Sequence, residues 1–214
     1  MSKFIHRFEP GTDPAAPPVL LLHGTGGDET DLLPLGRATA PGAALLSPRG
    51  AVLERCMPRF FRRLAGGVFD EDDLRQRAQD LAGFIGAAQT RYGIGAPVAL
   101  GYSNGANIAA ALLLLHPGTL RGAALLRAMV PLQAPPTANL RGTSVLMING
   151  DLDPIVPKEN ASRLATQLKE RGATLTTHDI PTGHGLSQTD ISLTQQWMEE
   201  ERTSFSEEKE AKRL

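Results

Sequence analysis

The sequence has little cysteine and no excess of charge of either sign. Cys56 is the one cysteine among 214 residues, so the chain cannot form an internal disulfide or a zinc site built from several cysteines. Lys and Arg number 22, Asp and Glu number 23, and the formal net charge is -1. Nucleic acids and anionic membranes are bound through clustered positive charge. We therefore expect neither as a partner.

Long hydrophobic runs are absent as well. The longest run, residues 108–115, is far shorter than the ~18 apolar residues that a membrane-spanning helix needs. Residues 1–7 carry charges where a signal peptide would have its apolar core. These absences, together with the lone cysteine, predict a cytoplasmic protein that is not exported and does not span a membrane.

The overall composition is that of an ordinary globular protein, with 41% hydrophobic and 21% charged residues. A length near 200 residues fits one domain, and no internal repeat or change in composition indicates a second. We expect a single domain over residues 1–214. Charged residues dominate the last stretch, 199–214, which we expect to be a solvated helix end or a frayed tail.

Short apolar runs bounded by glycine and proline alternate with segments of helical length. Strands buried on both faces in this way are typical of a parallel sheet. Residues 70–92 show a helical spacing of apolar side chains, with Asp70 as a candidate N-cap and Gly93 just past the end. The alternation predicts an α/β fold with a mostly parallel central sheet and helices on both faces. We expect strands at 19–23, 43–47, 98–102, 122–126, 144–149 and 174–180, and helices at 70–92, 104–116, 158–171 and 186–201.

The most informative residues are Gly-Tyr-Ser-Asn-Gly at 101–105, a G-x-S-x-G pattern between a predicted strand and a buried helix. In such a pattern, a sharp turn lifts the serine oxygen above the sheet, and the glycines avoid clashes that a β-carbon would cause. An ordinary glycine-rich turn is the alternative. The flanking strand and helix favour Ser103 as a nucleophile.

A serine hydroxyl needs a base to take its proton, and the base needs a third group to orient it. His184 lies in a flexible turn before the last predicted helix, from which it could reach over the sheet edge. His178 lies within a predicted strand, His116 near a helix end and His6 near the N-terminus. We therefore favour His184 as the base.

Two carboxylates follow the strand predicted at 144–149. Asp151 and Asp153 would point the same way if the strand continued, so their positions alone do not separate them. The one that does not orient the base is expected to hydrogen-bond its own turn before a proline. A glycine-rich loop, Leu-His-Gly-Thr-Gly-Gly at 22–27, follows an early strand, and the N–H groups of Thr25 and Asn104 would there converge on an oxyanion. A phosphate loop is the alternative, but no Lys-Ser or Lys-Thr follows and the glycine spacing differs.

With the serine turn, the acid and the histidine in this order, the chain resembles the α/β-hydrolase superfamily. More narrowly, it resembles bacterial carboxylesterases of the phospholipase/carboxylesterase group, which are related to acyl-protein thioesterases and lysophospholipases. The resemblance spans residues 19–198. It rests on the motifs at 22–27, 47–50 (Ser-Pro-Arg-Gly), 101–107, 150–157 (Gly-Asp-Leu-Asp-Pro-Ile-Val-Pro) and 183–184 (Gly-His). It implies an α/β-hydrolase fold, Asp153 as the acid, and oxyanion roles for Thr25 and Asn104.

Larger members of the superfamily carry a helical cap before the acid. Here residues 128–144 occupy that interval, which is too short for a cap, so we expect an open site shaped by the loops at 54–67 and 128–140. The candidate substrate-binding residues are Arg59, Phe60 and Met129. The arginines of the first loop could hold an anionic or aromatic ester. A solvated, salt-bridged loop with buried phenylalanines is the alternative for most of them.

These features predict a serine carboxylesterase that acts on a small-molecule ester through an acyl-enzyme, with Ser103, His184 and Asp153 as the triad and without metal or organic cofactor. A thioesterase or a lysophospholipase would use the same residues. A ligand-binding protein that has lost catalysis predicts a broken triad, whereas all three members are present. Relatives with this architecture often form homodimers, which makes a second copy of the chain a candidate partner.

Overall fold

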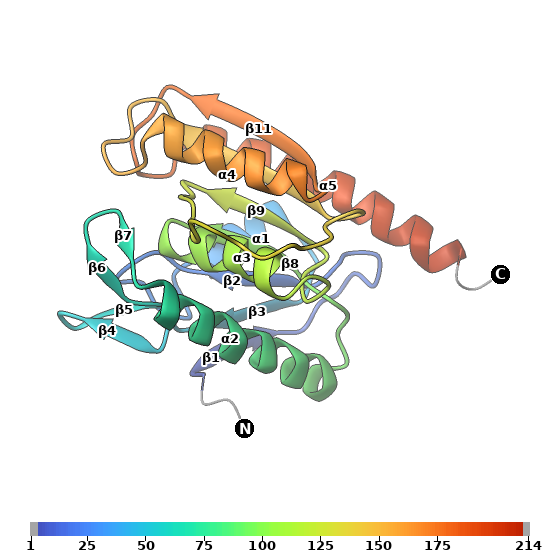
Figure 1. The fold of residues 1–214 in the computed structure, drawn as a ribbon. Coiled ribbons are helices and arrows are strands. Elements are labelled where there is room, and N and C mark those ends of the chain that lie inside the picture. The colour runs from blue at the N-terminus through green and yellow to red at the C-terminus, as the bar shows by residue number, and fades with distance from the viewer. Residues whose placement is uncertain (1–3, 212–214) are drawn as a thin grey trace.

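The computed structural model describes residues 4–211. A seven-stranded sheet runs through its centre (Figure 1). Its strands are β1 (His6–Glu9), β2 (Val19–Leu22), β3 (Leu45–Pro48), β8 (Val98–Tyr102), β9 (Gly122–Leu126), β10 (Ser144–Gly150) and β11 (Thr174–Ile180). They lie in the order β1-β3-β2-β8-β9-β10-β11. β1 pairs antiparallel with β3, and all the other pairs are parallel.

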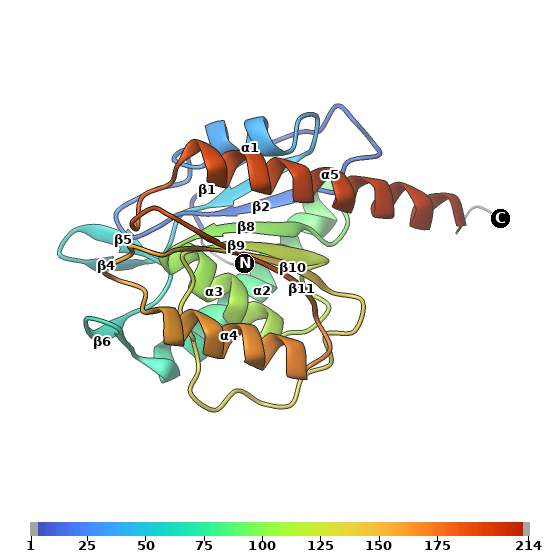
Figure 2. The same cartoon turned by 90° about the horizontal axis from the view of Figure 1, so that it is seen from above.

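Helices cover both faces of this sheet, as Figure 2 shows. They are α1 (Leu33–Thr39), α2 (Glu71–Tyr92), α3 (Asn104–Leu115), α4 (Lys158–Glu170) and α5 (Gln188–Ala211). α1 and α5 lie on one face, and α2, α3 and α4 on the other. The predicted α/β architecture is therefore confirmed.

Alternate residues of the central strands feed two hydrophobic clusters, one on each face. On β2, Leu20 and Leu22 belong to the cluster under α2, α3 and α4, whereas Val19 and Leu21 belong to the cluster under α1 and α5. All four side chains are fully buried, and burial of each contributes about 1.5–3 kcal/mol. This two-sided burial explains why β2 is a continuous apolar run rather than an alternating one.

Residues 54–67, which we expected to be a loop, instead form most of two small hairpins, so that expectation is wrong. The first joins β4 (Val52–Glu54) to β5 (Met57–Arg59), and the second joins β6 (Arg63–Ala65) to β7 (Val68–Phe69). Between β4 and β5, Arg55 and Cys56 have φ of 51° and 66°, which is the geometry of a tight two-residue hairpin turn. Glycine or asparagine usually marks such a turn, and neither is present here.

The last helix also differs from expectation. We predicted its end near residue 201, but α5 continues to Ala211, because contacts outside the hydrophobic core hold the extension. Arg202 bonds to Asp13, and the guanidinium of Arg121 binds Glu208 and lies over the ring of Phe205. Residues 212–214 of the predicted charged tail lie outside the described residues.

Residues 127–143, between β9 and β10, contain neither helix nor strand. The interval in which a cap was considered is thus a loop without a helix. None of the helices in residues 4–211 is long and apolar enough to cross a membrane.

Candidate active site

Ser103 occupies a sharp turn between β8 and α3. Its φ of 52° and ψ of -114° are strained for a residue with a β-carbon. The flanking glycines make the turn sterically feasible. A β-carbon at Gly101 would lie 2.7 Å from the Cα of Ala106, and one at Gly105 would overlap the carbonyl of Leu22. The chain therefore brings α3 directly against β2 and β8 and holds the serine at the start of the helix.

A chain of hydrogen bonds joins Ser103 to His184 and Asp153. The His184 Nε2 lies 2.9 Å from the Ser103 Oγ, and the His184 Nδ1 lies 2.7 Å from the Asp153 Oδ2. Because an ionised carboxylate only accepts, Nδ1–H donates to Asp153, and Nε2 is left to accept the serine proton.

The turn after β10 fixes the Asp153 carboxylate. Its Oδ1 accepts hydrogen bonds from the N–H groups of Ile155 and Val156, at 2.8 and 3.2 Å, and its side chain is fully buried. Asp151, two residues earlier, is exposed and pairs with Lys158 at 3.4 Å. The geometry therefore separates the two aspartates that the sequence alone left undecided, since Asp153 alone of the two contacts His184.

The other histidines considered from the sequence lie elsewhere. His178 is on β11, His116 ends α3, and His6 bonds to Tyr92. The fifth histidine, His23, is a buried residue of the glycine-rich loop: its Nδ1–H donates to the carbonyl of Gly24, and its Nε2 accepts the N–H of Gly50 at 2.9 Å. Burial lowers the pKa of His23, which favours the neutral ring that these two bonds require.

The backbone N–H groups of Thr25 and Asn104 donate no hydrogen bond to any other residue in the described part of the chain. Both residues line the same cavity as Ser103. The Asn104 side chain is fixed from behind, since its Oδ1 accepts the N–H of Phe60 at 2.8 Å. The two amides are thus free to bind an oxygen atom that enters the cavity.

Arg127 lies behind His184 and uses all five of its N–H donors. Three go to the carbonyl oxygens of Ile148, Gly183 and Gly185, at 3.1, 3.1 and 3.2 Å. Two form a bidentate pair with Asp190 of α5, at 2.7 and 2.9 Å. The guanidinium is 0% exposed. The residues on both sides of His184 are thus tied to the end of β10 and to the last helix.

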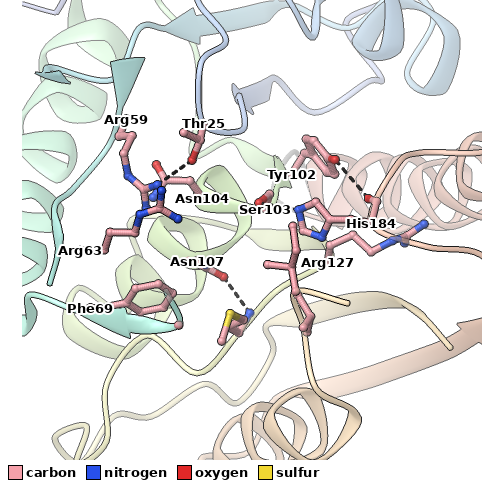
Figure 3. Close-up of a pocket in the computed structure, with 14 residues that line it drawn as sticks. Thr25, Arg59, Arg63, Phe69, Tyr102, Ser103, Asn104, Asn107, Arg127 and His184 are labelled. Carbon is pink, nitrogen blue, oxygen red and sulfur yellow. Dashed lines mark hydrogen bonds between the residues drawn. The ribbon is translucent and has the colours of Figure 1, made fainter. Parts of the chain in front are cut away.

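The cavity beside Ser103 has a volume of about 270 Å³. Figure 3 shows Ser103 between His184 on one side and two arginines, Arg59 and Arg63, on the other. Of the candidate substrate-binding residues, Arg59 and Met129 line the cavity. Phe60 does not: it is 2% exposed, and its ring packs on His23 with centroids 4.7 Å apart. We therefore no longer expect Phe60 to contact a substrate.

The sequence profile of the phospholipase/carboxylesterase family matches residues 5–200. The chain belongs to this family. It is 44% identical over 197 residues to the putative hydrolase MhqD of Bacillus subtilis (strain 168), which covers 91% of this chain and 98% of MhqD. The Bacillus cereus carboxylesterase superimposes with a TM-score of 0.91 at 43% identity, over 93% of this chain and 95% of that one. A carboxylesterase from Mesorhizobium loti gives 0.87 at 36% identity, over 91% and 94%.

These likenesses confirm the α/β-hydrolase fold and make the chain a hydrolase of the phospholipase/carboxylesterase family. The pair of Arg127 with Asp190 was missed from the sequence. Arg63, one of the first-loop arginines considered for an anionic or aromatic ester, lines the cavity. Among the described residues, no cluster of three His, Cys, Asp or Glu side chains could hold a metal ion.

Proposed function

We propose that this family member is a carboxylesterase that cleaves small-molecule esters through an acyl-enzyme on Ser103. The observation that carries the proposal is the position of His184, whose two ring nitrogens lie 2.9 Å from the Ser103 Oγ and 2.7 Å from the Asp153 Oδ2. This is the geometry that a nucleophile, a general base and an orienting carboxylate require.

In the first half of the reaction, the Ser103 Oγ attacks the acyl carbon while the His184 Nε2 takes its proton. The N–H groups of Thr25 and Asn104 stabilise the negative charge that develops on the carbonyl oxygen. His184 then gives the proton to the leaving alcohol oxygen as the carbon–oxygen bond breaks. In the second half, His184 takes a proton from water as the water oxygen attacks the acyl carbon. His184 then returns this proton to the Ser103 Oγ as the bond between the acyl carbon and Oγ breaks, which releases the acid.

The size of the cavity favours short esters over long-chain ones. A volume of about 270 Å³ lies just below the ~300–1,000 Å³ common for small-molecule sites. Arginine side chains also line it, and they are poor neighbours for a long acyl chain. Both features speak against binding the long acyl chain of a lysophospholipid. A short thioester remains the second candidate, and matched oxygen and thiol esters of one acid would measure that preference.

The first experiment combines turnover with covalent labelling. The purified protein is given 4-nitrophenyl acetate and, separately, a fluorophosphonate, and the labelled residue is located by peptide mass spectrometry. We expect hydrolysis, labelling at Ser103, and a loss of kcat of at least about 10³-fold in Ser103→Ala. Folded protein that neither turns over the ester nor becomes labelled would contradict the proposal.

The two aspartates provide a matched control for the role of the acid. Asp153→Asn leaves the shape of the side chain nearly unchanged, but its amide cannot accept two turn N–H bonds and also orient His184 as the carboxylate does. We expect kcat to fall by about 10²–10⁴-fold. Asp151→Asn, a like change on an exposed residue, should alter kcat by less than about twofold. Equal effects would contradict the assignment of Asp153.

A further inference from the structure

The cavity wall opposite His184 carries uncompensated positive charge. Arg59 ends β5 and Arg63 begins β6, and both line the cavity (Figure 3). The carboxylate of Glu54 is shared between them, with its Oε2 3.2 Å from the Arg59 Nε and its Oε1 2.9 Å from the Arg63 Nε. One carboxylate therefore faces two guanidinium groups. None of the described residues that line the cavity is an aspartate or a glutamate.

The donors of these two arginines are only partly used. The Arg59 Nε donates to the carbonyl of Phe61 at 3.2 Å, and its Nη1 donates to the Thr25 Oγ1 at 2.8 Å. The Arg59 Nη2, and both Nη groups of Arg63, donate to no other side chain or carbonyl within residues 4–211. The free donors thus belong to the groups that border the cavity.

Arg59 holds this position at an energetic disadvantage. It is 3% exposed, and burial, reinforced by the nearby charge of Arg63, lowers its pKa, while Glu54 opposes this only in part. A buried charge with unused donors is unfavourable unless a partner of opposite charge completes it. A carboxylate can supply this partner, because a guanidinium can bind its two oxygens through parallel hydrogen bonds.

We propose that Arg59 and Arg63 bind an ionised carboxylate of the substrate, so that the preferred ester carries a free carboxylate in addition to the ester group. This inference rests on the proposed ester hydrolysis and names its substrate class. Because Arg59 contacts Thr25, the carboxylate binds beside the glycine-rich loop while the ester carbonyl occupies the space next to Ser103. The carboxylate can belong to the acyl part or to the alcohol part.

The test uses pairs of esters that differ only in charge. For the acyl part, methyl half-esters of succinate, glutarate and adipate are compared with the same esters whose free carboxylate is a neutral amide. For the alcohol part, 4-acetoxybenzoate is compared with 4-acetoxybenzamide. In at least one arm we expect kcat/KM for the carboxylate to exceed that for the amide by about tenfold or more. The arm with the preference identifies the part of the substrate that is bound.

Arg63→Gln is the decisive variant, because Arg63 lies in the cavity wall without contacting Thr25. We expect it to reduce the carboxylate-to-amide ratio about tenfold. Arg62→Gln removes the same charge one residue earlier, where the side chain is 62% exposed and pairs with Asp70, and should leave the ratio as in the wild type. A ratio near one in every arm, or an equal loss for both members of a pair in Arg63→Gln, would overturn the inference.

Failure of this inference is distinguishable from failure of the proposed function. If the amide esters are hydrolysed as efficiently as the carboxylate esters, the proposed esterase activity is supported and the carboxylate site is contradicted. If no ester is hydrolysed, the carboxylate site is tested by binding alone. Calorimetry with Ser103→Ala protein should then show adipate bound at least about tenfold more tightly than adipamide. The added change Arg63→Gln should remove that difference. Equal binding of the two compounds would overturn the carboxylate site regardless of turnover.

Discussion

Two buried arginines flank Ser103, and they differ in what their donors contact. Arg127 uses all five N–H groups within the protein and pairs with Asp190. Arg59 is almost as deeply buried, but it shares Glu54 with Arg63 and leaves its Nη2 without a described partner. A guanidinium whose donors are all satisfied holds the backbone in place, whereas one with donors left in a cavity can bind a ligand. Burial alone does not distinguish these roles, but the number of N–H donors that already have a partner does.

The strongest way to break this comparison is to remove Arg127. Arg127→Ala leaves the Asp190 carboxylate buried without its partner and frees the segment around His184. We expect the free energy of unfolding to fall by about 3–5 kcal/mol, measured by urea denaturation. Arg37→Ala, which removes an exposed arginine paired with Glu9, is the control, with an expected loss of about 0–1 kcal/mol.

If Arg127→Ala does not fold, Arg127→Lys serves instead. Lysine keeps the charge but has three donors rather than five, so the carbonyls around His184 lose partners. We expect the factor by which kcat falls to be larger than the factor by which KM changes, because the variant alters the position of the base. A lysine variant with wild-type stability and kcat would show that the five hydrogen bonds of Arg127 do not matter.

The same measurement on Arg59 sharpens the comparison. Arg59→Gln removes the bonds to the Thr25 hydroxyl and the Phe61 carbonyl, but it also relieves the proximity of the two positive charges. We expect a smaller loss of stability, about 1–2 kcal/mol by urea denaturation. A loss of stability as large as that of Arg127→Ala would mean that Arg59 also mainly stabilises the fold. The two arginines would then not differ in role.

The smallest effect that we expect is the pH dependence of stability that comes from His23, in the glycine-rich loop that Arg59 contacts. Burial lowers the pKa of His23 from its ordinary value of 6.5, more strongly than Asp28, Glu29 and Asp31 raise it. The unfolded chain therefore takes up this proton first as the pH falls. His23 thus contributes stability above pH 6.5 that is lost as the pH falls below 6.5 toward the lowered value.

This dependence can be isolated by comparison with a variant. His23→Asn should lose less stability than the wild type between pH 8 and about pH 5.5, as measured by urea denaturation at each pH. Identical pH profiles for the wild type and His23→Asn would exclude His23 as the source of the loss.

The central elements were predictable because their residues show their burial and geometry locally. The all-apolar sequence of strands such as β2 predicts burial on both faces of a sheet, and the glycines around Ser103 predict a tight turn. β1 was missed because its residues, His-Arg-Phe-Glu, are mostly polar and do not form an apolar run. α1 was missed because its 7 residues are too few for a helical period to show. The hairpin of β4 and β5 was missed because Arg55 and Cys56 are not residues that usually accept positive φ.

The site was predictable to a different degree. Ser103 was predicted from its motif and His184 from its place in a turn before the last helix, whereas the choice of Asp153 over Asp151 depended on resemblance. In the structure Asp153 is the one of the two that contacts His184. Arg127 could not be recognised, because a charged residue just after a strand is normally exposed. Its burial depends on Asp190, which lies 63 positions later. A local sequence pattern cannot predict a pair that is so distant in sequence.

The position of Asp190 also has a consequence for how the protein matures. It lies in the first turn of α5, while its partner Arg127 directly follows β9. During synthesis, the segments that carry Ser103, Asp153 and His184 emerge before that helix is complete. Arg127 joins the carbonyls on both sides of His184 to Asp190, so we expect this backbone to reach its final position only once the first turn of α5 has docked.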